Sequence, residues 1–185
     1  MQATIPVLEN DLARLSGLSV MHCNDLWPVA TQEKLIQYSP SDVSTPAALR
    51  KYIEIALEKF QDTSAIPFVI FDKRVQKYAG STRYMNIDWT NKVLEIGSTW
   101  IGREFQGSGL NDAVKALMLK YAFTELNFEK VEFRIDERNM RSRKAVEKLG
   151  ATLEGILREN VYLLDGFKRN TCCYGLLKRE WDMVL

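Results

Sequence analysis

The chain has 185 residues, of which 46% are hydrophobic and 26% are charged, as in an ordinary globular protein. This length is typical of one domain, and we expect residues 1–185 to form a single domain. The formal net charge of +1 gives no overall reason to expect nucleic acid or an anionic membrane as a partner, so any anion must be bound by local geometry.

The first thirty residues lack a basic start followed by an apolar run, and no apolar run approaches the roughly 20 residues that cross a bilayer. The three cysteines are Cys23, Cys172 and Cys173, whose spacing suits neither a disulfide framework nor a metal site. We therefore expect a cytoplasmic protein without a metal.

The N-terminal third has a helical pattern, and the middle third has the pattern of strands. Over residues 18–60, apolar residues recur at helical spacing, for example at Leu49, Ile53, Ala56 and Phe60. Residues 67–71, 78–86 and 93–101 are short runs rich in β-branched and aromatic residues, separated by turn-like segments. We expect these three runs to form an antiparallel meander.

The helical pattern returns at Leu110 and continues to Ala122. Residues 131–135 read as a strand, which should pair in parallel with 93–101 through a right-handed crossover. A second helix is expected over 140–149, ending at Gly150, and two long strands are expected over 152–162 and 167–177. The order of elements predicts a mixed α/β fold with one central sheet.

A glycine-rich loop, Gln106-Gly107-Ser108-Gly109, stands between a predicted strand and the helix from Leu110. Backbone N–H groups at the start of a helix bind phosphate, and glycines let the backbone approach the anion closely. A dinucleotide-binding fingerprint would need glycine at position 112, which is Asp112. The loop therefore indicates either a phosphate site of another type or a plain glycine turn before a helix.

The helix after Asn139 carries a second unusual feature. Ser142 begins an otherwise apolar stripe that continues with Ala145, Val146 and Leu149. Taken singly, Asn139 is a helix N-cap and Ser142 is a small residue near a helix end. Together with the glycine loop, the two residues form a more specific pattern.

This order of elements and motifs resembles the acetyl-CoA-binding core of the GNAT N-acetyltransferases, and more narrowly the branch that contains RimJ and RimL. Residues 95–101, 138–143, 147–151, 154–158 and 165–166 carry the resemblance, which covers about residues 65–181. It implies the GNAT fold, a central mixed, mostly antiparallel twisted sheet with helices on both faces. It also implies acetyl-CoA as the acyl donor.

The resemblance implies roles for residues that match the family's motifs. The backbone of Trp100 and Ile101 would pair with pantetheine, and the loop from Gln106 to Asn111 would hold the pyrophosphate. Asn139 and Ser142 would line the cofactor's arm. The loop residues in this set are Gln106, Gly107, Ser108, Gly109, Leu110 and Asn111. Asn111 stands where the family usually has glycine or alanine.

The resemblance also suggests a catalytic base. Glu95 stands six residues before Ile101, the offset of the glutamate base in histone-acetylating members; the alternative is a surface-facing strand glutamate. The tyrosine that protonates the thiolate in many relatives is replaced by Val146. Ser142 is then the polar group on this stripe that can donate a hydrogen bond to the sulfur.

We therefore expect an N-acetyltransferase acting on a primary amine, such as a protein N-terminal α-amine, whose pKa near 8 makes it easier to deprotonate than lysine. Another acyl-CoA or a small-molecule amine is equally compatible with these motifs. A non-catalytic acyl-CoA-binding regulatory module is the alternative from a different class. The oligomeric state stays open between a monomer and a homodimer; in folds of this kind, exposed late strands often meet a partner.

Overall fold

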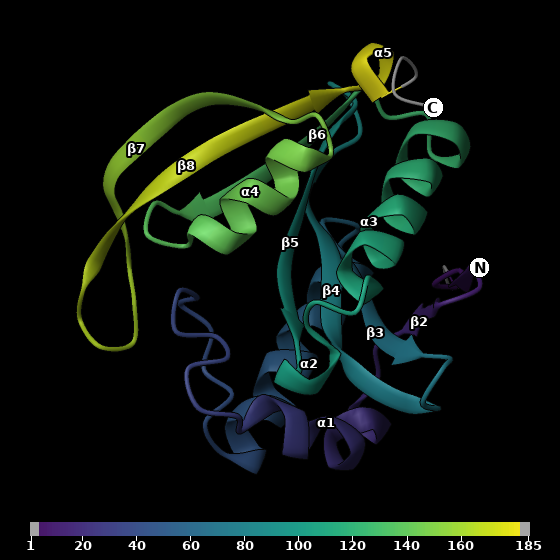
Figure 1. The fold of residues 1–185 in the computed structure, drawn as a ribbon, viewed down its shortest axis with the longest axis vertical. Helices are drawn as coiled ribbons and strands as arrows, with labels where there is room; N and C mark the ends of the chain where they lie inside the picture. Colours follow the sequence, from purple (N-terminus) through teal and green to yellow (C-terminus); the bar gives the residue numbers. More distant parts are fainter. Residues whose placement is uncertain (1–3, 182–185) are drawn as a thin grey trace.

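The computed structural model describes residues 4–181, and its centre is an eight-stranded sheet with strand order β1-β2-β3-β4-β5-β6-β8-β7 (Figure 1). The strands are β1 (Leu8–Glu9), β2 (Ala13–Gly17), β3 (Ile66–Asp72), β4 (Lys77–Asp88), β5 (Val93–Ile101), β6 (Lys130–Asp136), β7 (Thr152–Tyr162) and β8 (Lys168–Leu177). The helices are α1 (Cys23–Ala30), α2 (Pro46–Gln61), α3 (Leu110–Lys120), α4 (Met140–Lys148) and α5 (Lys178–Trp181). Within the described residues, β5 and β6 are the one parallel pair, so the prediction of a mixed, mostly antiparallel sheet is confirmed.

The parallel pair β5–β6 is short, and this shapes the molecule. Residues 93–95 of β5 pair in register with residues 130–132 of β6, and beyond Glu95 the strand β5 forms no further pair with β6. Beyond Glu95 the two strands diverge: β5 continues toward α1 and α2, while β6 stays with β8 and β7 (Figure 1). The second half of β5 therefore has one edge that is not paired within the sheet.

Helices cover both faces of the sheet, as predicted. One apolar cluster joins buried residues of α1 and α2, such as Leu26 and Ile53, to Trp100 of β5. The other joins Val114 of α3 and Val146 of α4 to buried residues of the strands. Because α3 and α4 share the second cluster, they lie on the same side and flank the gap between β5 and β6 (Figure 1).

Local sequence explains where α2 begins and where α4 begins and ends. The Thr45 hydroxyl accepts from the Ala48 N–H at 3.0 Å, and Pro46 occupies the first turn of α2. Asn139 caps α4, and Gly150 follows it with a φ of 93°, the left-handed conformation that ends helices. Both ends of α4 agree with the prediction to within one residue.

The N-terminal segment contains the main difference from the predicted elements. β1 and β2 extend the sheet beyond β3, with Ala13 paired to Asp72, and neither strand was predicted. Both are short, and their alternation is too brief to stand out in the sequence. Within residues 4–181, no helix combines the length and the apolar character needed to cross a membrane.

Candidate active site

A cavity of about 980 Å³ fills the gap where β5 and β6 diverge. Its walls come from α2, β4, β5, β6, α3 and α4, which are far apart in the sequence. The predicted site residues that line it are Glu95, Trp100, Ile101, Gln106, Gly107, Gly109, Asn111, Asn139 and Ser142. Ser108 and Leu110 do not line it. Leu110 is buried in the core, and the Ser108 hydroxyl accepts a hydrogen bond from Arg74.

The glycine loop has the backbone expected of an anion site. Gly107 and Gly109 have φ angles of 72° and 84°, in the left-handed region that favours glycine. Gly109 is the N-cap of α3 and offers no side chain to cap the first turn. The N–H groups of this turn therefore remain available to an anion, and a Cβ at Gly107 would meet nothing within 4 Å.

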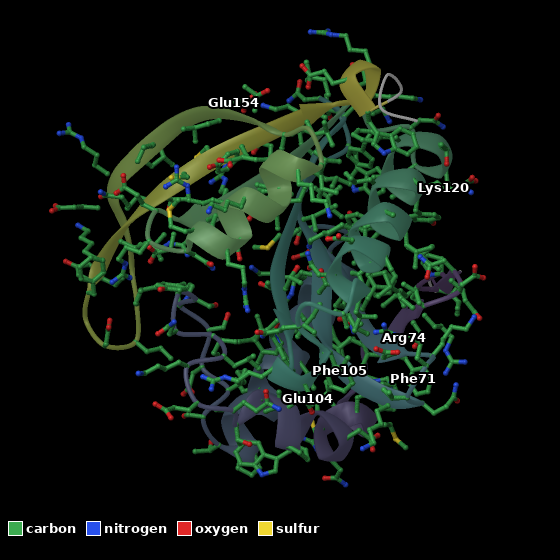
Figure 2. The ribbon with its side chains drawn as sticks, in the orientation of Figure 1. Phe71, Arg74, Glu104, Phe105, Lys120 and Glu154 are labelled. Carbon is green, nitrogen blue, oxygen red and sulfur yellow. The ribbon has the colours of Figure 1, made fainter. Side chains whose placement is uncertain are left out.

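Arg74 on the β3–β4 turn holds this loop in place, a role that the sequence did not reveal. Its Nη1 and Nη2 donate to the carbonyl and hydroxyl of Ser108 at 2.8 and 3.0 Å, and its Nη2 also contacts Asp72 Oδ2 at 2.6 Å. The hydrogen bond from Arg74 lowers the pKa of Asp72. Arg74 and Phe105, whose carbonyl accepts from the Ser108 hydroxyl, lie at the same end of the molecule in Figure 2.

The Gln106 side chain connects the glycine loop to β5 and to α4 by hydrogen bonds. Its Nε2 donates to the Ile101 carbonyl at 2.7 Å, and its Oε1 accepts from Arg141 of α4. The Ile101 carbonyl is therefore already satisfied from within the chain. The side chain of Trp100 points toward α2, where its indole N–H donates to the Tyr52 hydroxyl at 3.3 Å.

Asn139, the N-cap of α4, and Ser142 in its first turn both line the cavity. The Asn139 Oδ1 accepts from the Ser142 N–H at 3.2 Å, so Asn139 is the N-cap that its sequence position suggested. Among the hydrogen bonds of the described residues, none involves the Ser142 hydroxyl, and Val146 is buried one turn further on. Ser142 is thus a polar group facing a cavity with an otherwise apolar helix stripe behind it.

Glu95 is buried, which excludes the surface-facing glutamate as a reading of this position. The residue is 6% exposed, and its Oε2 accepts from Asn86 Nδ2 at 2.7 Å and lies 3.7 Å from Arg134 Nε. Burial raises the pKa of Glu95, and the Asn86 hydrogen bond and the Arg134 charge oppose that rise. A carboxylate with a raised pKa in a cavity is typical of a proton acceptor.

Lys115 is a second titratable group in the cavity, and the sequence analysis missed it. Its Nζ donates to the Thr99 hydroxyl at 2.8 Å, and the residue is 6% exposed. Burial lowers the pKa of Lys115 to about 7. The charged residue lies beside the apolar stripe of α3, so helical periodicity alone suggests an exposed position.

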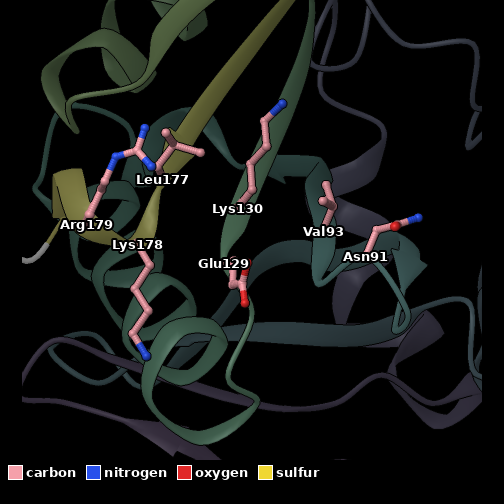
Figure 3. A pocket seen from close by; sticks show the side chains of 7 residues that line it. All are labelled: Asn91, Val93, Glu129, Lys130, Leu177, Lys178 and Arg179. Carbon is pink, nitrogen blue, oxygen red and sulfur yellow. The ribbon is translucent and has the colours of Figure 1, made fainter.

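A smaller hollow of about 460 Å³ lies at the other end of the same strands (Figure 3). Its lining includes Val93 at the start of β5, Lys130 at the start of β6 and Leu177 at the end of β8. It contains none of the predicted site residues. The candidate chemistry is therefore confined to the larger cavity.

Comparisons with known proteins agree with this architecture. Residues 14–152 match the model of the family described as acetyltransferase (GNAT) domain. "Putative ribosomal N-acetyltransferase YdaF" of Bacillus subtilis is 37% identical over 97 residues, which cover 52% of this chain and 52% of that relative. The match therefore spans about half the length of YdaF.

Two other comparisons extend over nearly the whole chain. The ribosomal-protein-serine acetyltransferase of Escherichia coli is 28% identical, with 90% of this chain and 93% of that relative covered. A solved structure from T. thermophilus, described as a putative acetyltransferase, is 31% identical with a TM-score of 0.87, and covers 100% of this chain and 95% of that one. Because this family model matches most of its length, the chain belongs to the GNAT acetyltransferase family.

Proposed function

We propose that this chain transfers the acetyl group of acetyl-CoA to a protein N-terminal α-amine, with Glu95 as the base. The observation that carries the proposal is one cavity that joins an uncapped helix N-terminus to a buried carboxylate of raised pKa. These are the two chemical needs of the reaction: a site for an anionic donor and an acceptor for the amine's proton.

The described residues fit acetyl-CoA. The α3 N-terminus with Gly107 and Gly109 suits the pyrophosphate, and Gln106 and Asn111 line the cavity beside it. The unpaired edge of β5 around Trp100 suits an extended amide-containing arm, which can pair with it as a strand does. When bound, acetyl-CoA supplies the acyl thioester.

The protein's own side chains would handle the proton and the sulfur. Glu95 would accept the proton of the attacking amine, either directly or through water. Ser142 would donate a hydrogen bond to the sulfur, since Val146 offers no polar atom. Much of the acceleration would come from holding the amine and the thioester in attack geometry.

Two relatives support a protein acceptor, because their names assign them to ribosomal proteins. We also propose a cytoplasmic location, which is supported by three free cysteines that a reducing compartment would preserve. A homodimer remains a prediction.

Turnover with matched acceptors tests this function. The protein is incubated with acetyl-CoA and peptides whose N-terminus is free, and with the same peptides blocked at the N-terminus but carrying lysine. We expect release of free CoA thiol, and acetylation located by mass spectrometry, with the free N-terminus only. Tight binding of acetyl-CoA without release from any peptide or small amine would instead favour the non-catalytic module. Release with small amines alone would replace the protein acceptor.

A further inference from the structure

Arg83 of β4 is a buried cation without an anionic partner. It is 5% exposed, and its Nε and Nη2 atoms are buried without a hydrogen-bond partner. No ion pair formed by the described residues includes it. Buried guanidinium groups are normally paired, because a charge away from water is costly, so this exception requires an explanation.

The guanidinium is held in position by an aromatic ring. Its central carbon lies 4.4 Å from the centroid of the Tyr52 ring, within cation–π distance. Tyr52 is itself fixed, since its hydroxyl donates to the Ser98 carbonyl at 3.4 Å and accepts from Trp100. The ring covers a face of the guanidinium and leaves the N–H groups of its edge without acceptors from the protein.

Arg83 lines the large cavity, so a ligand can supply the missing acceptors. Within residues 4–181, Ser81 is the other residue with a buried unpartnered side-chain atom, and it does not line the cavity. The acidic side chains that line the cavity already have partners: Asp42 with Ser44, Glu95 with Asn86 and Arg134, Asp112 with Lys148, and Asp136 with Arg138. Arg83 therefore lines this cavity as a buried cation whose Nε and Nη2 donors the described residues leave unpaired.

The sheet register places Arg83 beside the proposed base. Arg83 pairs with Gly97 across β4 and β5, and Met85 pairs with Glu95, so Arg83 and Glu95 are diagonal neighbours on one face. Such Cα atoms are about 7–8 Å apart. Gly97 lets the Glu95 carboxylate and the Met85 side chain pack against the backbone of β5, because a Cβ there would lie 3.0 Å from Glu95 Oε1 and 2.7 Å from Met85 Sδ.

We infer that Arg83 forms a carboxylate-binding subsite, so that the preferred acceptor carries a carboxylate a few bonds from the amine that is acetylated. The guanidinium edge would bind the carboxylate with two parallel hydrogen bonds while the amine faces Glu95. The carboxylate can be the side chain of an N-terminal residue or the α-carboxylate of a free amino acid. This inference rests on the proposed acetyl transfer for its reaction, but the subsite itself is a binding property.

Matched acceptor pairs test the subsite in turnover. One pair is a peptide that begins with aspartate and the same peptide that begins with asparagine; the other is a free amino acid and its amide. We expect the wild-type kcat/KM to favour one carboxylate by at least about tenfold, and the pair that shows the preference identifies its source. Arg83→Gln should bring that ratio close to one with acetyl-CoA affinity unchanged, and Arg83→Lys should keep part of it.

Arg14 provides the control, because its guanidinium also stacks on an aromatic ring, 4.6 Å from the centroid of Phe71, but does not line the cavity. Arg14→Gln should leave the ratio unchanged. If Arg83→Gln does not fold, the kcat/KM ratio within each acceptor pair, measured in wild-type protein and in Arg83→Lys, still tests the subsite. Equal rates within both pairs, or a preference that survives in Arg83→Gln, would overturn the subsite.

A binding experiment that does not depend on turnover tests the subsite separately from the proposed function. Calorimetry with CoA present compares the N-acetylated aspartate and asparagine peptides, and also the N-acetylated amino acid and its amide. We expect the carboxylate form of one pair to bind at least about tenfold more tightly to wild-type protein, but not to Arg83→Gln. Absence of turnover with this binding preference would reject the reaction and retain the subsite. Equal binding within both pairs would reject the subsite.

Discussion

The two ends of the cavity are built in different ways. The proposed cofactor half, which we define as residues 96–111 with Asn139 and Ser142, would bind acetyl-CoA mainly through backbone groups that a short stretch of chain supplies. The proposed acceptor half, defined as Tyr52, Arg83 and Glu95, consists of side chains from three separate elements. A backbone site depends on local conformation and tolerates many side chains, whereas a side-chain site depends on tertiary packing.

The largest expected effect is a loss of kcat/KM without a loss of acetyl-CoA affinity, from a change of the proposed base in the acceptor half. Glu95→Gln should lower kcat/KM by about 10²–10⁴-fold, the usual contribution of a general base, while acetyl-CoA affinity stays unchanged. Because burial raises the pKa of Glu95, activity should fall at a higher pH on the acidic side than an ordinary glutamate would give. Above that pH, the loss should be greatest where the amine is still protonated, and should shrink as pH approaches the amine's pKa. Rates measured across pH check this.

Glu132 is the matched control, since it pairs directly with Glu95 across the parallel strands but does not line the cavity. Glu132→Gln should keep most of the activity and move the acidic limb to a lower pH, because the charge of Glu132 adds to the rise in the Glu95 pKa. A uniform loss in Glu95→Gln at every pH would remove Glu95 as the base.

The next effect concerns the cofactor half. Gly109→Val should weaken acetyl-CoA binding about 10- to 100-fold, because valine does not adopt a φ of 84° and the N–H groups would turn away from the anion. Gly166 is the control: it has a φ of 82° with open space around it, in the turn between β7 and β8. Calorimetry should show normal affinity in Gly166→Val. Unchanged affinity in Gly109→Val would move the phosphate site elsewhere.

The smallest effect is on stability. Lys115→Met should raise the free energy of unfolding at pH 7 by about 1–3 kcal/mol, because it removes the cost of burying an ammonium. The folded pKa of about 7 is below the unfolded value, so the unfolded state binds more protons between pH 7 and about 10.4. Wild-type stability should therefore rise with pH across this range relative to the variant.

Urea unfolding at several pH values measures this difference. Lys120, exposed at the end of the same helix (Figure 2), is the control, and Lys120→Met should change little. A loss of stability in Lys115→Met at pH 7 would mean that the hydrogen bond to Thr99 outweighs the cost of burial.

The sequence predicted the fold well and singled out residues that line one cavity, because both rest on short-range patterns. The helical period from Leu110, the strand at 93–101 and the Gly107–Gly109 loop are all local. The resemblance of the motifs to a known family then linked the loop to Trp100, Asn139 and Ser142. The short strands β1 and β2 lacked enough residues to show an alternation.

The acceptor half could not be predicted in the same way. Arg83 reads as an exposed charge on a strand, and its burial depends on Tyr52, which is 31 residues earlier in the chain. Lys115 and Arg74 depend likewise on partners at Thr99 and Ser108. Glu95 was proposed only through its offset from Ile101, and its burial and its hydrogen bond to Asn86 arise from the tertiary structure.

Backbone hydrogen–deuterium exchange with acetyl-CoA tests the division of the cavity most directly. At saturation, verified by calorimetry, we expect slower exchange over residues 98–112, where the edge of β5 and the first turn of α3 would donate to the cofactor. Residues 81–86 should exchange unchanged, because the acceptor half binds through side chains. Saturated protein with unchanged exchange at 106–111 would contradict the account.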